Sequence, residues 1–115
     1  MADLTAEVVV VGGGPAGLTA AIALAAAGVE TALVAAPHSG RDHRTTALLA
    51  GSVMALDALG VWARCREHAA PLRVLRIVDD TARLWRAPEV AIAASEIALD
   101  AFGHNVENWF VVSAL

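Results

Sequence analysis

The chain has only one cysteine, Cys65, and its eight basic residues are all arginines, against twelve acidic residues. A single cysteine excludes an intrachain disulfide and a cysteine cluster for zinc. The net charge of −4 argues against a general nucleic-acid-binding protein, because such a protein carries a basic surface. The four histidines show no ligand spacing with cysteines or acids on one helix face. The sequence therefore predicts neither a nucleic-acid partner nor a metal site.

Charged residues are also absent between Val8 and Val29, a run long enough to span a bilayer. Glycines and a proline interrupt the run at positions 12–17, and much of the remainder is alanine, which is barely hydrophobic. Acidic residues precede the run, whereas a signal peptide begins with basic residues. We therefore expect neither a membrane span nor a signal peptide.

The apolar residues instead follow the pattern of an α/β domain. Hydrophobic residues make up 57% of the 115 residues, which excludes a disordered chain and suffices for one domain. Two short β-branched runs, 7–11 and 31–34, flank a segment with helical spacing that ends at Gly28. Strand, helix and strand with short connections predict a βαβ unit with parallel strands.

A glycine pattern joins the first strand to the helix. Gly12, Gly14 and Gly17 form G-x-G-x-x-G directly after a strand and at the start of a helix, which is the context that makes this pattern informative. The first glycine permits a sharp turn, the second lets a pyrophosphate approach the backbone, and the third lets the helix pack closely. Pro15 suits the first helical position. The sequence therefore predicts a Rossmann-type dinucleotide site.

The acid that usually holds the adenosine ribose is missing. It is expected about twenty residues after the glycines, where the chain has Ala35 and Ala36. Other groups, or none, could hold the ribose. Alternatively, Arg41 and Arg44 could receive a ribose 2′-phosphate, which would make the ligand NADP, or they could be solvated loop charges.

The remaining elements are predicted from local patterns. We expect a loop over 36–43, a helix over 45–59, a shorter helix over 61–68 and strands over 73–78 and 82–86 around a turn. An extended segment with a bend near Gly103 should follow, and then a helix that begins at Trp109 and is capped by Asn108. This helix would have only seven residues, so we expect the chain to be cut from a longer one.

Three stretches, 10–18, 44–62 and 95–108, resemble the FAD-dependent aromatic hydroxylases of the para-hydroxybenzoate hydroxylase type, and most closely the ubiquinone-biosynthesis hydroxylases. The resemblance implies that FAD is the dinucleotide and that Arg44 reaches its phosphates from the following helix. Ala35, in place of the acid, departs from the family pattern. The implied cofactor-binding residues, with no catalytic residue among them, are Gly12, Gly14, Pro15, Ala16, Gly17, Ala35 and Arg44.

The resemblance also implies an organisation and a function. Residues 1–70 would form the βαβ core and the following helices, and residues 71–115 the start of a substrate-domain sheet. The chain would be the N-terminal FAD-binding part of an NAD(P)H-using monooxygenase that hydroxylates a small aromatic, ubiquinone-precursor-like substrate, in the cytoplasm or peripherally at a membrane. By itself it should be inactive.

Two alternatives stay open at this point. One is a solitary NAD(P)-binding module, suggested by the missing acid and the two loop arginines. The other is a truncated chain without catalysis, stabilised by homo-oligomers that cover its exposed sheet edges.

Overall fold

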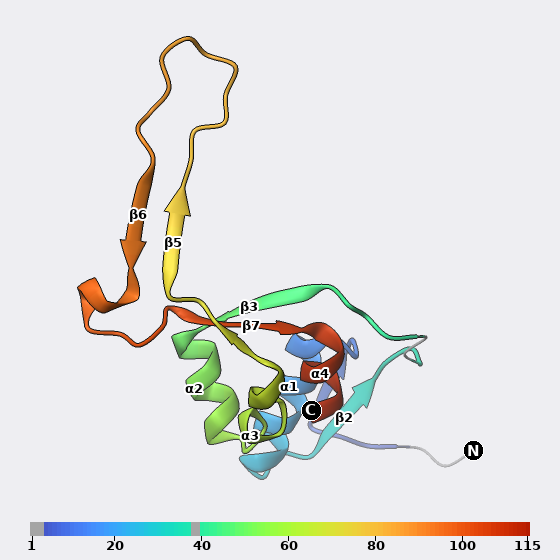
Figure 1. The fold of residues 1–115 in the computed structure, drawn as a ribbon. Coiled ribbons are helices and arrows are strands. Elements are labelled where there is room, and N and C mark those ends of the chain that lie inside the picture. Colours follow the sequence, from blue (N-terminus) through green and yellow to red (C-terminus); the bar gives the residue numbers. More distant parts are fainter. Residues whose placement is uncertain (1–3, 38–39) are drawn as a thin grey trace.

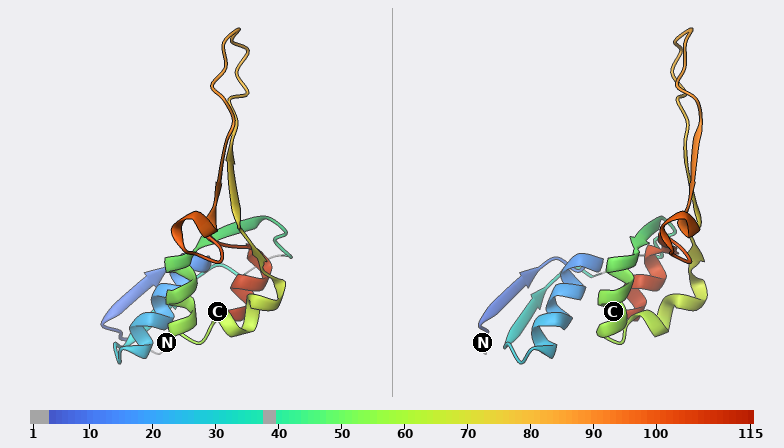
Figure 2. Two further views of the ribbon diagram at one scale, coloured as in Figure 1. Left: turned by 60° about the vertical axis from the view of Figure 1, so that its left-hand side comes forward. Right: turned by 90° about the vertical axis from the view of Figure 1, so that its left-hand side faces the viewer.

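A computed structural model describes residues 4–37 and 40–115 and shows that the chain begins with the predicted βαβ unit (Figure 1). Strand β1 (Val8–Val11), helix α1 (Pro15–Ala26) and strand β2 (Thr31–Val34) follow one another. The two strands pair in parallel, from Val8 opposite Thr31 to Val11 opposite Val34. Helix α1 packs on both strands and, on its other side, contacts the last helix of the chain (Figure 2).

The predicted helix over 45–59 is wrong in its first third. Residues Thr45–Leu49 form strand β3, and helix α2 covers only Ala50–Ala58. The two β-branched threonines favour a strand, and β3 pairs antiparallel with β7 (Gly103–Glu107) along its whole length. Arg44 therefore directly precedes a strand. The family resemblance had implied that Arg44 lies on a helix, and this prediction is wrong.

After α2 the chain closes the small core. Helix α3 (Trp62–Cys65) and the 3₁₀ turn η1 (Arg66–His68) occupy the segment predicted as a short helix. Strand β4 (Ala70–Pro71) then pairs with β7. Leu56, Val61, Cys65 and Ala114 form the buried cluster, so the end of the chain completes a core built by its middle.

A long hairpin, called the hairpin arm below, projects from the rest of the chain, which forms the body (Figures 1 and 2). Strand β5 (Val74–Ile77) confirms the strand predicted over 73–78, but its partner is β6 (Val90–Ala93) and not residues 82–86. The turn is wider than predicted because the Asp79 carboxylate accepts hydrogen bonds from the backbone N–H groups of Thr81 and Ala87, 3.1 and 3.0 Å away. Residues 78–89 therefore form the far end of the arm.

The 3₁₀ turn η2 (Ala94–Ile97) interrupts the segment predicted as extended, and β7 then returns to the body. Strand β7 lies between β3 and β4. An added Cβ on Gly103 would lie 2.1 Å from the carbonyl oxygen of Leu48, so this glycine lets the two strands approach. The division of the chain near residue 70 stays a prediction.

Helix α4 (Asn108–Ala114) ends the chain. The predicted capping role of Asn108 is wrong, because its side chain makes no cap hydrogen bond and bonds to other segments instead. None of the helices in the described ranges is long and apolar enough to cross a membrane.

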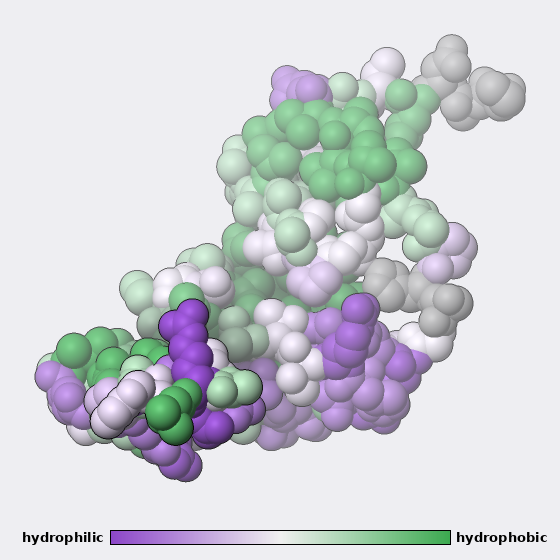
Figure 3. All heavy atoms as spheres, turned by 90° about the horizontal axis from the view of Figure 1, so that it is seen from above, coloured by the Kyte–Doolittle hydropathy of each residue, from purple (hydrophilic) through white to green (hydrophobic). Residues whose placement is uncertain are grey.

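Much of the apolar surface is uncovered. Val11 of β1 is 80% exposed, and the hairpin arm carries Leu84 and Trp85 at 93% and 88%. Figure 3, which looks down on the arm, shows hydrophobic surface there and a larger hydrophobic area in the upper part of the view.

Candidate cofactor-binding site

The glycine turn between β1 and α1 is shaped by two of its glycines. Gly12 has a φ of +125°, which L side chains rarely adopt, and its N–H donates to the carbonyl oxygen of Val34, 2.8 Å away. An added Cβ on Gly17 would lie 2.0 Å from the carbonyl oxygen of Gly12. Gly12 thus permits the turn, and Gly17 lets α1 start directly against it.

The middle glycine is different. Gly14 is the residue before α1, with a φ of −76° and a ψ of 174° that any residue can adopt. An added Cβ there would meet nothing within 4 Å among the described residues. Neither backbone conformation nor packing within this part of the chain therefore requires a glycine at position 14. The space beside its backbone is open.

A cavity of about 210 Å³ lies at this point. Three segments meet there: the start of α1, the loop before β3, and the start of α4. Its lining residues in the described part of the chain are Gly14, Pro15, Gly40, Asp42, Arg44, Asn108, Trp109 and Val112.

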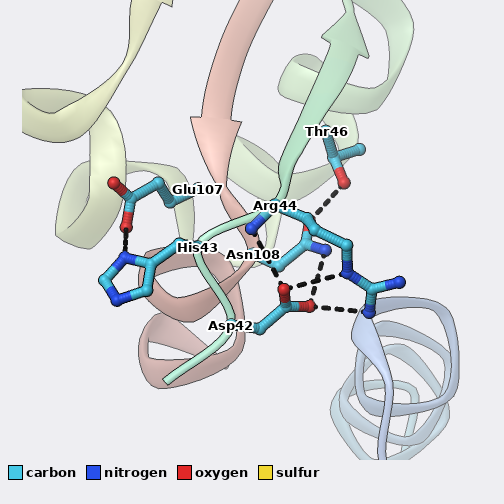
Figure 4. Close-up of polar contacts among 6 residues, drawn as sticks. All are labelled: Asp42, His43, Arg44, Thr46, Glu107 and Asn108. Carbon is cyan, nitrogen blue, oxygen red and sulfur yellow. Dashed lines mark hydrogen bonds and ion pairs between the residues drawn. The ribbon is translucent and has the colours of Figure 1, made fainter.

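Polar side chains on one side of the cavity form a connected network (Figure 4). The Asp42 carboxylate accepts from Nε and Nη2 of Arg44, both at 3.0 Å. It also accepts from the Arg44 backbone N–H and from Nδ2 of Asn108, again at 3.0 Å. Thr46 in turn donates its hydroxyl to Oδ1 of Asn108. The hydrogen bonds from Arg44, and then that from Asn108, hold the pKa of Asp42 well below its usual range.

The two loop arginines have separate partners. Arg41 lies 3.8 Å from the Glu107 carboxylate, and its guanidinium carbon lies over the Phe110 ring, 5.2 Å from the ring centre. The same Glu107 carboxylate also accepts a hydrogen bond from Nδ1 of His43 at 3.2 Å. Arg44 is held by Asp42 instead. The geometry therefore does not direct both arginines to one anion.

The structure brings some of the predicted residues together. Gly14, Pro15 and Arg44 line the cavity. Ala16 lines an adjacent apolar groove between α1 and α2. Ala35 follows the end of β2 and lines neither the cavity nor the groove.

Sequence reasoning missed Asp42 and Asn108 as parts of this site. The position of Asp42, two residues before the candidate arginine, is a signal that could have suggested an ion pair. Nothing local connects Asp42 with Asn108, which is 66 residues away.

A parallel βαβ unit whose glycine turn opens onto a cavity with Asp42, Arg44 and Asn108 in its lining defines a dinucleotide-binding protein of the α/β class. The family described as FAD binding domain matches residues 5–106. The chain therefore belongs to the family of FAD-binding domains, and FAD is its cofactor.

Known relatives agree with this assignment. The ubiquinone hydroxylase UbiL of Rhodospirillum rubrum is 32% identical over 120 residues, which cover 99% of this chain and 27% of the relative. Among solved structures, the flavin-dependent monooxygenase PieE, in complex with FAD and substrate, has a TM-score of 0.65 at 29% identity. The p-nitrophenol 4-monooxygenase PnpA of Pseudomonas putida DLL-E4 has a TM-score of 0.66 at 25% identity.

Both structural alignments cover 99% of this chain, but only 22% of PieE and 28% of PnpA. The chain thus spans about a quarter of the length of its relatives. The resemblance to FAD-dependent hydroxylases is confirmed.

Proposed function

We propose that this chain is the FAD-binding part of an NAD(P)H-using monooxygenase that hydroxylates a small aromatic, ubiquinone-precursor-like substrate, in the cytoplasm or at a membrane surface. The chain alone would bind FAD without turnover, since it corresponds to about a quarter of its relatives. FAD, when bound, supplies the redox chemistry that such a reaction needs. The residues of this chain would hold the cofactor.

The open space beside Gly14 is the observation that carries the placement of the cofactor in this proposal. A glycine that neither its backbone angles nor its neighbours require is explained by a group that approaches the backbone from outside. The N–H groups at the start of α1 and the helix dipole favour an anion there. A pyrophosphate fits both conditions, and it would lie beside Gly14 and Pro15, with Gly12, Ala16 and Gly17 shaping the turn behind it.

Arg44 would supply the positive charge. Only its Nε and Nη2 atoms are bonded to Asp42, and in the hydrogen bonds of the described residues its Nη1 has no partner. Its side chain is 86% exposed and lines the same cavity as Gly14. Arginine is well suited to phosphate because it offers paired N–H groups in one plane.

Titration of FAD with the purified chain, followed by quenching of flavin fluorescence, tests the proposal. We expect saturable FAD binding and a weakening of about tenfold or more for Arg44→Ala, as is typical for a lost hydrogen bond to a charged group. Arg86→Ala, in the loop at the far end of the hairpin arm, is the matched control and should bind as the parent does.

Two outcomes would contradict the proposal. One is a folded chain that neither quenches FAD nor is thermally stabilised by it. The other is preferential binding of NADP over FAD, which would instead support the solitary NAD(P)-binding module.

A further inference from the structure

Asp42 lies at the centre of the polar network although it has no place in the glycine pattern. Its two carboxylate oxygens accept four hydrogen bonds, three from Arg44 and one from Asn108. We infer that Asp42 is a positioning residue for cofactor binding: it holds one edge of the Arg44 guanidinium and thereby presents the other edge to the start of α1. This inference rests on the proposed function, which places a pyrophosphate there.

The two edges of the guanidinium are used differently. Asp42 occupies the side edge, formed by Nε and Nη2. No residue in the described ranges accepts a hydrogen bond from the end edge, formed by Nη1 and the second N–H of Nη2. Two parallel N–H groups are the geometry in which arginine binds phosphate. Arg44 lines the same cavity as Gly14 and Pro15 at the start of α1, and in the view of Figure 4 its guanidinium is drawn next to the blue ribbon. One arginine can therefore bind Asp42 and a phosphate at the same time.

Among the described residues, the Arg44 side chain has no hydrogen-bond partner other than Asp42. Arg44 is 86% exposed, and a free arginine side chain loses considerable rotamer freedom when a ligand immobilises it. The ion pair restricts the side chain before the ligand arrives. Part of the entropic cost of binding is thus removed in advance.

Asp42 itself is held from other segments. Asn108, at the start of α4, donates to it, and Thr46 of β3 orients the Asn108 amide. Backbone bonds join the same segments: the Asn108 N–H donates to the Arg44 carbonyl at 2.8 Å, and the Trp109 N–H to that of Asp42 at 3.1 Å. The loop that carries Arg44 is therefore fastened to β3 and α4.

The same contacts argue against a direct role for Asp42 in place of the missing ribose acid. An ionised carboxylate offers about four lone-pair sites, and all four are in use. A ribose hydroxyl would have to displace one of these donors. Asp42 thus acts on the ligand through Arg44.

A double-mutant cycle on FAD affinity tests the inference. We compare the parent chain, Asp42→Asn, Arg44→Ala and the double variant by flavin fluorescence quenching, with far-UV circular dichroism as the check on folding. We expect Asp42→Asn to weaken FAD binding about three- to tenfold in the parent, the range for one immobilised side chain. In the Arg44→Ala background it should have no effect.

A matched control and a second variant accompany the cycle. Asp79 is also a hydrogen-bonded aspartate, but it lies on the hairpin arm, so Asp79→Asn should leave FAD affinity unchanged. If Asp42→Asn does not fold, Asn108→Ala removes one contact of Asp42 and should weaken binding by a smaller factor, again only when Arg44 is present.

The outcomes separate the inference from the proposed function. An equal loss for Asp42→Asn with and without Arg44 would mean that Asp42 touches the ligand itself, and the inference would be overturned. Tighter binding by Asp42→Asn would also overturn it, because charge repulsion would then outweigh positioning. Both results leave the proposed function intact if Arg44→Ala weakens FAD binding. If Arg44→Ala leaves FAD binding unchanged, the phosphate-binding role of Arg44 is refuted, and with it the basis of the inference and of the proposed function.

Discussion

Substitution of Gly17 by alanine should destabilise the fold, whereas the same change at Gly14 should mainly weaken cofactor binding. The added methyl group at position 17 would lie 2.0 Å from the carbonyl oxygen of Gly12 and 3.0 Å from its carbon. Since Cβ contacts below 3.0 Å essentially do not occur, α1 must move away from the turn by about 1 Å. That movement strains the glycine turn, which is joined to β2 by the hydrogen bond from the Gly12 N–H to the Val34 carbonyl oxygen.

The expected cost follows from this clash. Overpacking a tight contact costs about 1–3 kcal/mol, and a backbone contact with no flexible neighbour should reach the upper end of that range. A loss of about 3 kcal/mol lowers the melting midpoint of a domain of this size by roughly 10–15 °C. Gly14→Ala should lower the free energy of unfolding by less than about 1 kcal/mol, because the added Cβ meets nothing within 4 Å. The remaining cost is that glycine is preferred over alanine at the N-cap position of a helix, which Gly14 occupies in α1.

Thermal unfolding followed by circular dichroism, together with FAD titration, separates the two effects. Gly17→Ala should melt well below the parent. Gly14→Ala should melt close to it yet bind FAD more weakly, since its methyl group enters the space proposed for the pyrophosphate. Equal melting midpoints for the two variants, or unchanged FAD affinity in Gly14→Ala, would contradict these roles of Gly17 and Gly14.

Three further expectations concern other parts of the chain. Gly103→Ala should lower the melting midpoint about as much as Gly17→Ala, since its Cβ would lie 2.1 Å from the Leu48 carbonyl oxygen; an unchanged midpoint would contradict the close approach of β3 and β7. Burial raises the pKa of the Cys65 thiol above its usual value near 9, so a thiol reagent should label the chain only on unfolding, and stability should fall as the pH rises above about 9; rapid labelling of the folded chain would argue against this. Trypsin should cut first after Arg83 and Arg86, at the end of the arm, as mass spectrometry of the early fragments can show, and first cleavage after Arg64 would be the contrary result.

The parts that could be predicted are those with local causes. The βαβ unit follows from two β-branched runs, a helical repeat and glycines at fixed spacing, all within the first 34 residues. Helix α2 was placed correctly from Ala50 onward because its helical pattern is local. The preceding five residues were assigned wrongly because their strand partner, β7, lies more than fifty residues away in the sequence.

The candidate site divides in the same way. Gly14, Pro15 and Arg44 could be named from pattern and resemblance, and they do line one cavity. The link from Asp42 to Asn108 could not, because an aspartate and an asparagine 66 residues apart carry no local signal of contact. The hairpin partner of β5 was missed since the Asp79 carboxylate, and not the tight turn expected there, organises the loop.

The parallel βαβ unit, the glycine turn and the dinucleotide-binding class thus follow from local sequence, because spacing along one short segment sets backbone angles and close approach there. Tertiary contacts were needed to make residues 45–49 a strand, to require a small residue at Gly103, and to join Asp42, which holds Arg44, to Asn108. Each of these depends on which distant backbone or side chain arrives next to the residue. Hydrogen bonds and close contacts between segments choose among conformations that the local sequence leaves nearly equal in free energy.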